Sequence, residues 1–190
     1  MRLILVLGGN RSGKSRFAQR LVAQCPRVTY LATGEETDPE MAARIARHRA
    51  DRPAHWQTVE AAQRLGAAVA QIPAETAVLL DDIGFLVAGV LWRGGYEQSD
   101  PERLNDLEAE LTTEVDALVA AAQGRAAPVV VVSSEVGSSL VPTTPVGRAF
   151  QDLLGRANQH LAAAATQVFV CFAGLPLELT ALAQREDTDG

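Results

Sequence analysis

The chain has 190 residues, 47% of them hydrophobic, and carries a net charge of −6 at pH 7. This length suits one domain whose core needs no metal or disulfide, and two cysteines are too few for a disulfide framework. We therefore expect a soluble protein of the reducing cytoplasm. The acidic balance argues against nucleic-acid binding, and the apolar run Leu3–Leu7 is too short for a signal peptide or a membrane span.

Five apolar runs rich in β-branched residues predict buried strands. They lack the alternation of polar residues that a half-exposed strand shows, which is typical of parallel strands covered on both faces. The predicted strands are Leu3–Leu7, Val28–Ala32, Ala77–Leu80, Pro128–Ser133 and Gln167–Phe172.

Helical stretches are predicted between these strands, and two of them begin with an aspartate cap followed by proline, at Asp38-Pro39 and Asp100-Pro101. The predicted helices are Lys14–Ala23, Pro39–Arg49, Thr58–Gln71, Pro101–Ala122 and Pro145–Ala165. Because strands and helices alternate, the fold class is α/β, with a doubly wound, mostly parallel sheet and helices on both faces. We expect one domain over the whole chain, with a frayed tail at 184–190.

A glycine-rich loop joins the first predicted strand to the first predicted helix. It matches the pattern G-x-x-x-x-G-K-[ST] with Gly8, Gly9, Asn10, Arg11, Ser12, Gly13, Lys14 and Ser15. In such a loop the backbone amides turn toward phosphates and the helix N-terminus adds positive charge. Lys14, the only lysine of the chain, reaches the outer phosphates and the Ser15 hydroxyl ligates Mg²⁺. The pattern therefore predicts a P-loop NTPase-like protein that binds a nucleoside triphosphate with Mg²⁺.

The predicted strand Ala77–Leu80 runs into two acids, Asp81 and Asp82. A P-loop protein needs a metal-directing carboxylate at the end of a neighbouring strand, and either residue meets this requirement. The alternative is that the carboxylate caps the following turn.

His48 lies on the predicted helix Pro39–Arg49 among arginines. The four arginines nearest to it in sequence are Arg44, Arg47, Arg49 and Arg52. Cationic groups of this kind would help an imidazole that attacks an α-phosphate, because they neutralise the triphosphate. The pattern alone leaves both a nucleophilic and a structural histidine open.

Motifs spread in order along nearly the whole chain carry a family resemblance. They are Gly8–Ser15, Tyr30–Thr33, Asp38–Ile45, His48–Glu60, Ser134–Gly137, Val141-Pro142, Gly147–Asp152 and Gly155–Gln159. In these motifs the chain resembles the bifunctional adenosylcobinamide kinase/adenosylcobinamide-phosphate guanylyltransferase family of cobalamin biosynthesis.

The resemblance implies two reactions. A nucleoside triphosphate, GTP or ATP, first phosphorylates the aminopropanol hydroxyl of adenosylcobinamide. GTP then transfers GMP to that phosphate through a guanylyl-histidine, which matches His48, with release of pyrophosphate. Further positions that match nucleotide contacts of the family are Ala32, Thr33, Gly34, Arg49, Ala50, Asp51, Arg52, Glu60 and Asp81. The resemblance also implies a homo-oligomer, expected to be a trimer.

Two motifs depart from the family pattern. The chain has Asp82 where the family usually has cysteine, and Ser134 where it usually has asparagine. These departures leave open a protein that retains the transferase step alone. The P-loop by itself would also fit a kinase for a different small molecule or a non-catalytic nucleotide-binding protein. We also expect the segment from Gly34 to Arg52 to move toward the P-loop when nucleotide binds, and the stretch Val141–Gln159 to face either the corrinoid or a neighbouring subunit.

Overall fold

The computed structural model describes residues 2–34, 42–43, 46, 49, 52–96 and 100–183. His48, Ala50 and Asp51 lie outside the described residues, as do most of the predicted helix Pro39–Arg49 and the tail 184–190. The expected movement of the segment Gly34–Arg52 concerns mainly these residues and stays a prediction.

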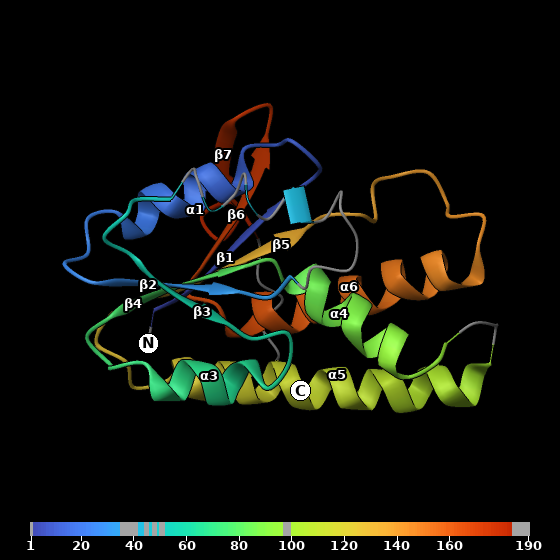
Figure 1. The fold of residues 1–190 in the computed structure, drawn as a ribbon. Coiled ribbons are helices and arrows are strands. Elements are labelled where there is room, and N and C mark those ends of the chain that lie inside the picture. Colours follow the sequence, from blue (N-terminus) through green and yellow to red (C-terminus); the bar gives the residue numbers. More distant parts are fainter. Residues whose placement is uncertain are drawn as a thin grey trace, which may run out of the picture.

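The described residues form a seven-stranded sheet in the order β3-β2-β4-β5-β1-β6-β7 (Figure 1). Its strands are β1 (Leu3–Gly8), β2 (Val28–Ala32), β3 (Gln57–Glu60), β4 (Ala77–Asp81), β5 (Val129–Ser134), β6 (Gln167–Phe172) and β7 (Leu175–Glu178). All neighbouring pairs are parallel except β6 and β7, which form an antiparallel hairpin. The mostly parallel sheet predicted from the apolar runs is confirmed.

Helices cover both faces of this sheet, because successive side chains of each buried strand point to opposite faces and both sets are apolar. The helices are α1 (Lys14–Val22), α3 (Leu65–Gln71), α4 (Ile83–Arg93), α5 (Pro101–Ala122) and α6 (Pro145–Ala164). One core cluster packs α1 on the sheet through Ala18 and Val22, and the larger cluster joins the sheet to the other four helices. Figure 1 shows α1 on one side of the sheet, with α3 and α5 on the other.

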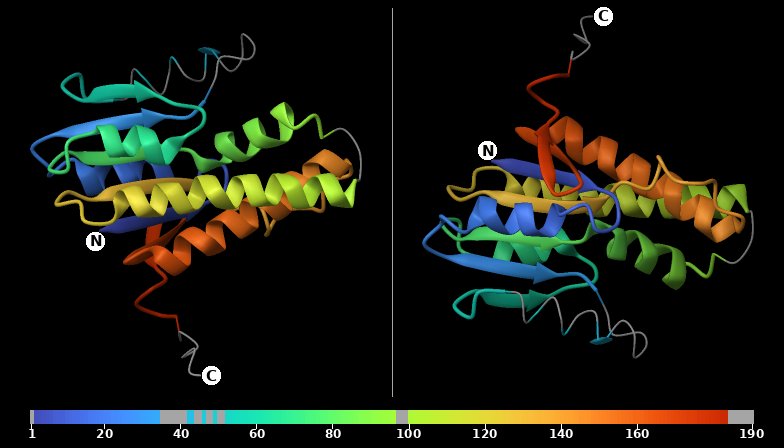
Figure 2. Two further views of the ribbon diagram at one scale, coloured as in Figure 1. Left: turned by 90° about the horizontal axis from the view of Figure 1, so that it is seen from below. Right: turned by 90° about the horizontal axis from the view of Figure 1, so that it is seen from above.

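The parallel strands end at one edge of the sheet, and their register brings distant residues together there. Gly8 pairs with Ser134, and Ala32 pairs with both Asp81 and Glu60. Figure 2 shows that α4, α5 and part of α6 extend past this edge. The edge therefore has helices beside it and is open toward the loops, which is where α/β proteins bind ligands.

The predicted helix Thr58–Gln71 is wrong in its first part. Residues Gln57–Glu60 form the edge strand β3, and the helix α3 begins only at Leu65. Pairing of Val59 with Leu31 of β2 decides the strand, since a local apolar pattern does not reveal such a partner. A positive φ of 53° at Arg64 then separates the strand from the helix.

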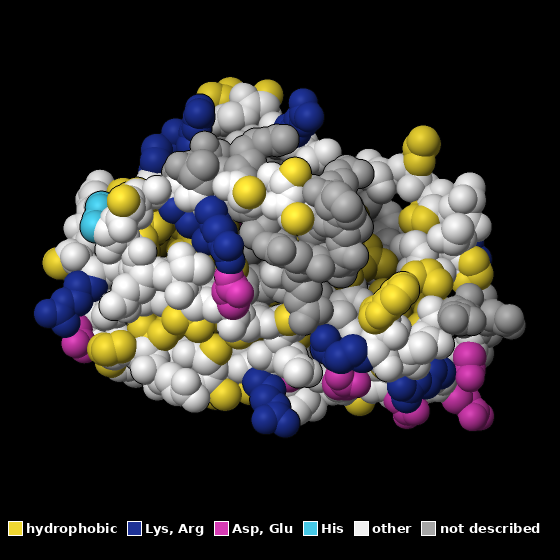
Figure 3. Space-filling model, in the orientation of Figure 1, with side chains coloured by type: hydrophobic (Ala, Val, Ile, Leu, Met, Phe, Trp, Pro, Cys, Tyr) yellow, Lys and Arg dark blue, Asp and Glu magenta, His cyan; other side chains and the backbone are white. Residues whose placement is uncertain are grey.

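Helix α4 and strand β7 were not predicted from the sequence. Helix α4 is apolar on most of its surface, so it lacks the helical stripe of polar and apolar residues that would have indicated it. Strand β7 has exposed apolar residues, Leu175 and Leu177, and continues from the exposed Phe172 of β6. Figure 3 shows apolar side chains at the top of the view, over this hairpin.

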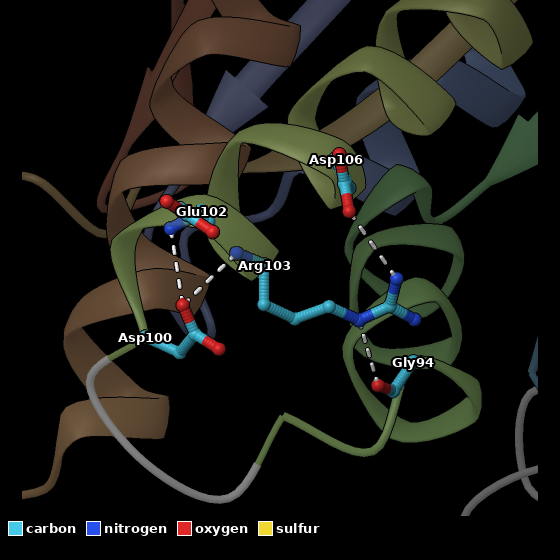
Figure 4. Close-up of polar contacts among 5 residues, drawn as sticks. All are labelled: Gly94, Asp100, Glu102, Arg103 and Asp106. Atoms are coloured by element: carbon cyan, nitrogen blue, oxygen red, sulfur yellow. Dashed lines mark hydrogen bonds and ion pairs between the residues drawn. The ribbon is translucent and has the colours of Figure 1, made fainter.

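The predicted helix Pro101–Ala122 is confirmed with both its bounds, and the predicted cap explains its beginning. The Asp100 carboxylate accepts hydrogen bonds from the backbone amides of Glu102 (3.1 Å) and Arg103 (3.2 Å) (Figure 4). The Arg103 side chain donates to the carbonyl of Gly94 (3.1 Å) and lies 3.7 Å from Asp106. Arg103 thus ties the end of α4 to the start of α5.

In the part of the chain that the structure describes, no helix has both the length and the apolarity needed to cross a membrane.

Candidate nucleotide-binding site

The glycine-rich loop occupies the turn between β1 and α1, at the carboxyl edge of the sheet. Gly13 directly precedes α1 as its N-cap with a φ of 92°, and a Cβ atom there would lie 3.0 Å from the Cα of Gly174 in the β6–β7 turn. A Cβ atom on Gly8 would lie 2.4 Å from Ser12 Oγ. Both positions therefore require glycine, the first for its backbone conformation and both for close approach.

Backbone hydrogen bonds hold the loop on two sides. The amide of Gly174 donates to the carbonyl of Ser12 (2.9 Å), and the amide of Glu135 donates to the carbonyl of Gly8 (3.0 Å). Neither Gly174 nor Glu135 was among the predicted site residues, because both reach the loop only through the tertiary fold. The loop is thus supported by the ends of β5 and of the β6–β7 hairpin.

Lys14 and Ser15, which follow the glycines, contact the loop itself and the end of β4. Lys14 Nζ lies 3.5 Å from the carbonyl of Gly9, folded back over the loop. Ser15 Oγ donates to Asp81 Oδ1 over 3.4 Å, from the first turn of α1 to the end of β4. A hydroxyl and a carboxylate oxygen this close fit Mg²⁺, which uses one or two protein oxygens and completes its shell with phosphates and water.

Asp81 is held from its other side by Tyr30 of β2. The Tyr30 hydroxyl donates a hydrogen bond of 2.8 Å to Asp81 Oδ2. Burial raises the pKa of Tyr30, and the negative charge of Asp81 raises it further, so the hydroxyl stays protonated and remains a donor. Asp81 is therefore fixed between Ser15 and Tyr30. Tyr30 was not among the predicted site residues. The signal that could have indicated it is a hydroxyl within the apolar run of β2.

Asp82 has a different position from Asp81. Its carboxylate caps α4 by accepting from the amide of Gly84 (2.6 Å), and it also accepts from Ser134 Oγ (2.9 Å). Its backbone amide donates to Thr33 Oγ1 (3.0 Å), and the Thr33 hydroxyl donates to its carbonyl (2.7 Å). Burial raises the pKa of the Asp82 carboxyl, and the neighbouring Asp81 charge adds to this. Of the two acids, Asp81 faces the P-loop serine and Asp82 caps the next helix.

Two arginines of the predicted site lie beside β3. Arg49 forms an ion pair with Glu60, and Arg52 lies with its guanidinium 3.4 Å from the centroid of the Tyr30 ring. Figure 3 shows this side of the molecule, with basic side chains over α1 and over β2 and β3. Arg52 Nη1 is also 3.5 Å from Thr58 Oγ1. Arg52 is thereby connected through Tyr30 to Asp81, at the end of the segment that carries His48.

The remaining predicted positions lie along the end of β2. The Ala32 carbonyl accepts from the amide of Ala61 (2.9 Å), Thr33 is buried, and a Cβ atom on Gly34 would contact Phe85. The structure therefore brings the P-loop, Thr33 and Asp81 to one edge, with Arg49, Arg52 and Glu60 at the end of the same sheet.

A glycine-rich loop that leads into Lys-Ser at a helix N-terminus, with an acid at the end of a neighbouring parallel strand, defines a P-loop nucleotide-binding protein of the α/β class. Residues 4–179 match the family described as cobinamide kinase / cobinamide phosphate guanyltransferase, and the chain belongs to this family. The P-loop fold and the family expected from the motifs are both confirmed.

The chain is similar to curated relatives over nearly their whole length. It is 42% identical to the bifunctional adenosylcobalamin biosynthesis protein CobU of Salmonella typhimurium over 180 residues, which cover 93% of this chain and 99% of the relative. The protein of the same name from Escherichia coli is 41% identical over 179 residues, with the same coverage. The bifunctional adenosylcobalamin biosynthesis protein CobP of Pseudomonas aeruginosa is 38% identical over 177 residues, covering 92% and 95%.

Proposed function

We propose that this chain phosphorylates adenosylcobinamide and then transfers GMP from GTP to adenosylcobinamide phosphate, giving adenosylcobinamide-GDP and pyrophosphate. The observation that carries the proposal is the Ser15–Asp81 contact beside Lys14, in a chain of this family. Ser15 and Asp81 supply oxygen ligands for Mg²⁺, and Lys14 supplies the positive charge that a bound nucleoside triphosphate requires.

In the kinase step, Lys14 and the loop amides would bind the outer phosphates, and Ser15 and Asp81 would hold the metal ion. Bound Mg²⁺ neutralises charge on the phosphate oxygens. The hydroxyl oxygen of the acceptor attacks the γ-phosphorus and loses its proton to solvent, the bond to the bridging oxygen breaks, and the nucleoside diphosphate leaves. The protein's contribution is to align the two reactants and to stabilise charge.

In the transfer step, we assign the nucleophile to His48. One imidazole nitrogen attacks the α-phosphorus of GTP and pyrophosphate leaves; a phosphate oxygen of the acceptor then attacks the GMP phosphorus and the P–N bond breaks. Arg49 and Arg52 support this assignment, because they flank His48 in sequence and lie beside β3, with Arg52 linked through Tyr30 to Asp81. Their positive charges would stabilise the charge that develops on the α-phosphate.

The proposal is tested by labelling the protein with α-³²P-GTP and Mg²⁺. We expect label that is stable to base and labile to acid on the wild type and on His55→Ala, a control histidine that is exposed. His48→Ala should carry none. Label that persists on His48→Ala overturns the assignment of the nucleophile.

A second measurement separates the kinase step from the transfer step. With γ-³²P-labelled nucleotide and adenosylcobinamide, we expect label on the corrinoid with both wild type and His48→Ala. Guanylylation of the protein without any transfer of the γ-phosphoryl group would instead indicate a protein that retains only the transferase step.

We further propose that the chain works as a cytoplasmic homo-oligomer, expected to be a trimer. Exposed apolar residues on the β6–β7 hairpin, Phe172, Leu175 and Leu177, support a contact between copies. Both cysteines are free, which suits a reducing compartment. Light scattering should give three times the chain mass of 20.2 kDa, and Leu175→Glu should lower it.

A further inference from the structure

A cavity of about 550 Å³ lies between the loop that follows β5 and one side of α6. Gly137 and Ser139 line it from the loop, and Gln151, Asp152, Gly155 and Gln159 line it from three successive turns of the helix. We call this cavity the α6 groove. None of these residues contributes to the nucleotide site described above.

The α6 groove begins close to the P-loop. The amide of Glu135 donates to the carbonyl of Gly8, and Gly137, two residues further on, already lines the groove. Two residues span at most about 8 Å between Cα atoms. The Gln151 side-chain amide donates to the carbonyl of Val136 (2.6 Å) and fixes this part of the loop on α6. The end of the groove at Gly137 therefore lies near the start of the P-loop.

Gly155 is the feature that points to a ligand. A glycine inside a helix costs about 1 kcal/mol relative to alanine, so its presence calls for a reason. Gly66 of α3 has one, since a Cβ atom there would lie 2.4 Å from Ala117, and so has Gly147 of α6, where it would lie 2.8 Å from Pro142. A Cβ atom on Gly155 would meet nothing within 4 Å, and the backbone there has no positive φ. The packing of the described residues gives no reason for glycine, but a ligand in the groove would.

The groups around Gly155 are of a kind that binds amides. Four polar lining residues are exposed, namely Ser139, Asp152, Arg156 and Gln159. Together they offer hydroxyl, carboxylate, guanidinium and carboxamide groups that accept or donate hydrogen bonds. Val141, which also lines the groove, and its neighbour Leu140 are exposed and offer apolar contact. This mixture suits a macrocycle with an apolar ring and a periphery of carboxamide arms.

We propose that the α6 groove binds the cobinamide substrate, receiving one edge of the macrocycle with its amide arms and leaving the aminopropanol hydroxyl toward the P-loop. This inference rests on the proposed function, since it takes the acceptor from there. Gly155 is then a residue that makes room for the acceptor.

The test replaces Gly155 with leucine and uses Ala163→Leu as its control. Ala163 is exposed on the same helix and is not among the residues that line the groove. Equilibrium dialysis of cobinamide, followed by its visible absorbance, measures binding without any turnover. Gly155→Leu should weaken binding at least tenfold, and Ala163→Leu should leave it unchanged. The thermal midpoint of Gly155→Leu should equal or exceed that of the wild type, because leucine is the better helix former.

Guanylylation by labelled GTP needs no acceptor and reports separately on the nucleotide site. Equal cobinamide affinity of Gly155→Leu and wild type overturns the inference and leaves the proposed function intact. A lowered midpoint or a changed molar mass in both Gly155→Leu and the smaller variant Gly155→Ala overturns it too, because it would make the groove a packing or subunit contact. If the wild type bound cobinamide but catalysed neither reaction, and Gly155→Leu lost this binding, the groove would be supported as the cobinamide site. The proposed function would then be overturned.

Discussion

Ser134 Oγ donates a hydrogen bond of 2.9 Å to the buried carboxylate of Asp82, across the ends of the neighbouring strands β5 and β4. These two residues stand at the positions where the motifs of this chain depart from the family pattern, which usually has asparagine and cysteine there. The two departures therefore face each other. A hydroxyl donor beside a buried carboxylate satisfies one of its oxygens, and the amide of Gly84 satisfies the other.

We predict that Asp82 makes the stability of the nucleotide-free protein depend on pH. Burial and the Asp81 charge raise the pKa of Asp82 above its ordinary value of 3.8, so the folded protein binds this proton more tightly than the unfolded chain. The contribution of Asp82 to stability therefore increases as the pH falls through the raised pKa, and levels off below the ordinary value. Asp82→Asn should remove this dependence. The free energy of unfolding of the variant, relative to that of the wild type, should therefore increase as the pH rises from the ordinary value of 3.8 through the raised pKa.

Urea denaturation at a series of pH values measures the difference between wild type and Asp82→Asn. Glu110→Gln, which changes an exposed carboxylate on α5, serves as the control and should follow the wild type at every pH. A difference between wild type and Asp82→Asn that stays constant with pH would contradict the role of Asp82.

Tyr30→Phe should weaken the binding of Mg²⁺ in both reactions. The substitution keeps the ring under Arg52 but removes the hydroxyl that holds Asp81 Oδ2. Loss of a group that orients a metal ligand typically costs about 10- to 100-fold in metal affinity or activity. We expect a rise of this size in the Mg²⁺ concentration that gives half-maximal guanylylation, with a loss of about 1 kcal/mol in stability. Tyr96→Phe, in the other core cluster, should lose no Mg²⁺ affinity.

Lys14→Arg should strongly reduce nucleotide-dependent activity although it keeps the positive charge. The ammonium of Lys14 folds back to 3.5 Å from the Gly9 carbonyl, a position that a planar guanidinium does not reproduce. We expect kcat/KM for GTP to fall by about 100-fold or more, as for the loss of one preorganised donor. Arg16→Lys, an exposed position in the next part of α1, is the matched control and should retain activity. Full activity of Lys14→Arg would argue against contact between Lys14 and the phosphates.

Among the arginines that the structure describes, Arg125 should be the one whose replacement by alanine lowers the free energy of unfolding most. Its buried guanidinium donates to four backbone carbonyls at the end of α3 and in the turn to β4: Val69 (3.1 Å), Ile72 (2.9 Å), Pro73 (2.9 Å) and Thr76 (2.9 Å). Arg125→Ala leaves these carbonyls without their donor, which should cost about 3 kcal/mol or more in the free energy of unfolding. The cost is measured by urea denaturation.

Arg27→Ala provides the comparison for Arg125. Arg27 forms an exposed ion pair with Glu75 at 3.7 Å, and such surface pairs contribute about 0–1 kcal/mol. If Arg125→Ala cost no more than Arg27→Ala, the four carbonyls would not depend on Arg125 for their hydrogen bonds.

The sequence by itself determined the parts of this protein that depend on local pattern. Apolar runs indicated five of the strands, and an aspartate-proline cap placed the start of α5 at Pro101. The P-loop could be recognised from the sequence because its glycines, lysine and serine lie in one short segment of the chain. The motifs were sufficient to identify the family, since they recur in order over nearly the whole length.

Only the tertiary structure decided which residues, far apart in sequence, contact one another at the site. The strand-end pattern left Asp81 and Asp82 open, and only the family resemblance favoured Asp81. The fold distinguishes the two acids because Ser15 and Tyr30 approach Asp81, while Ser134 and the start of α4 approach Asp82. The contacts of Ser15, Tyr30 and Ser134 join residues about 50 or more positions apart. Strand β3 was predicted as helix for the same reason, since its partner β2 lies elsewhere in the chain. A local pattern reports the preference of a segment, whereas the partners of a side chain depend on which strands the sheet places side by side.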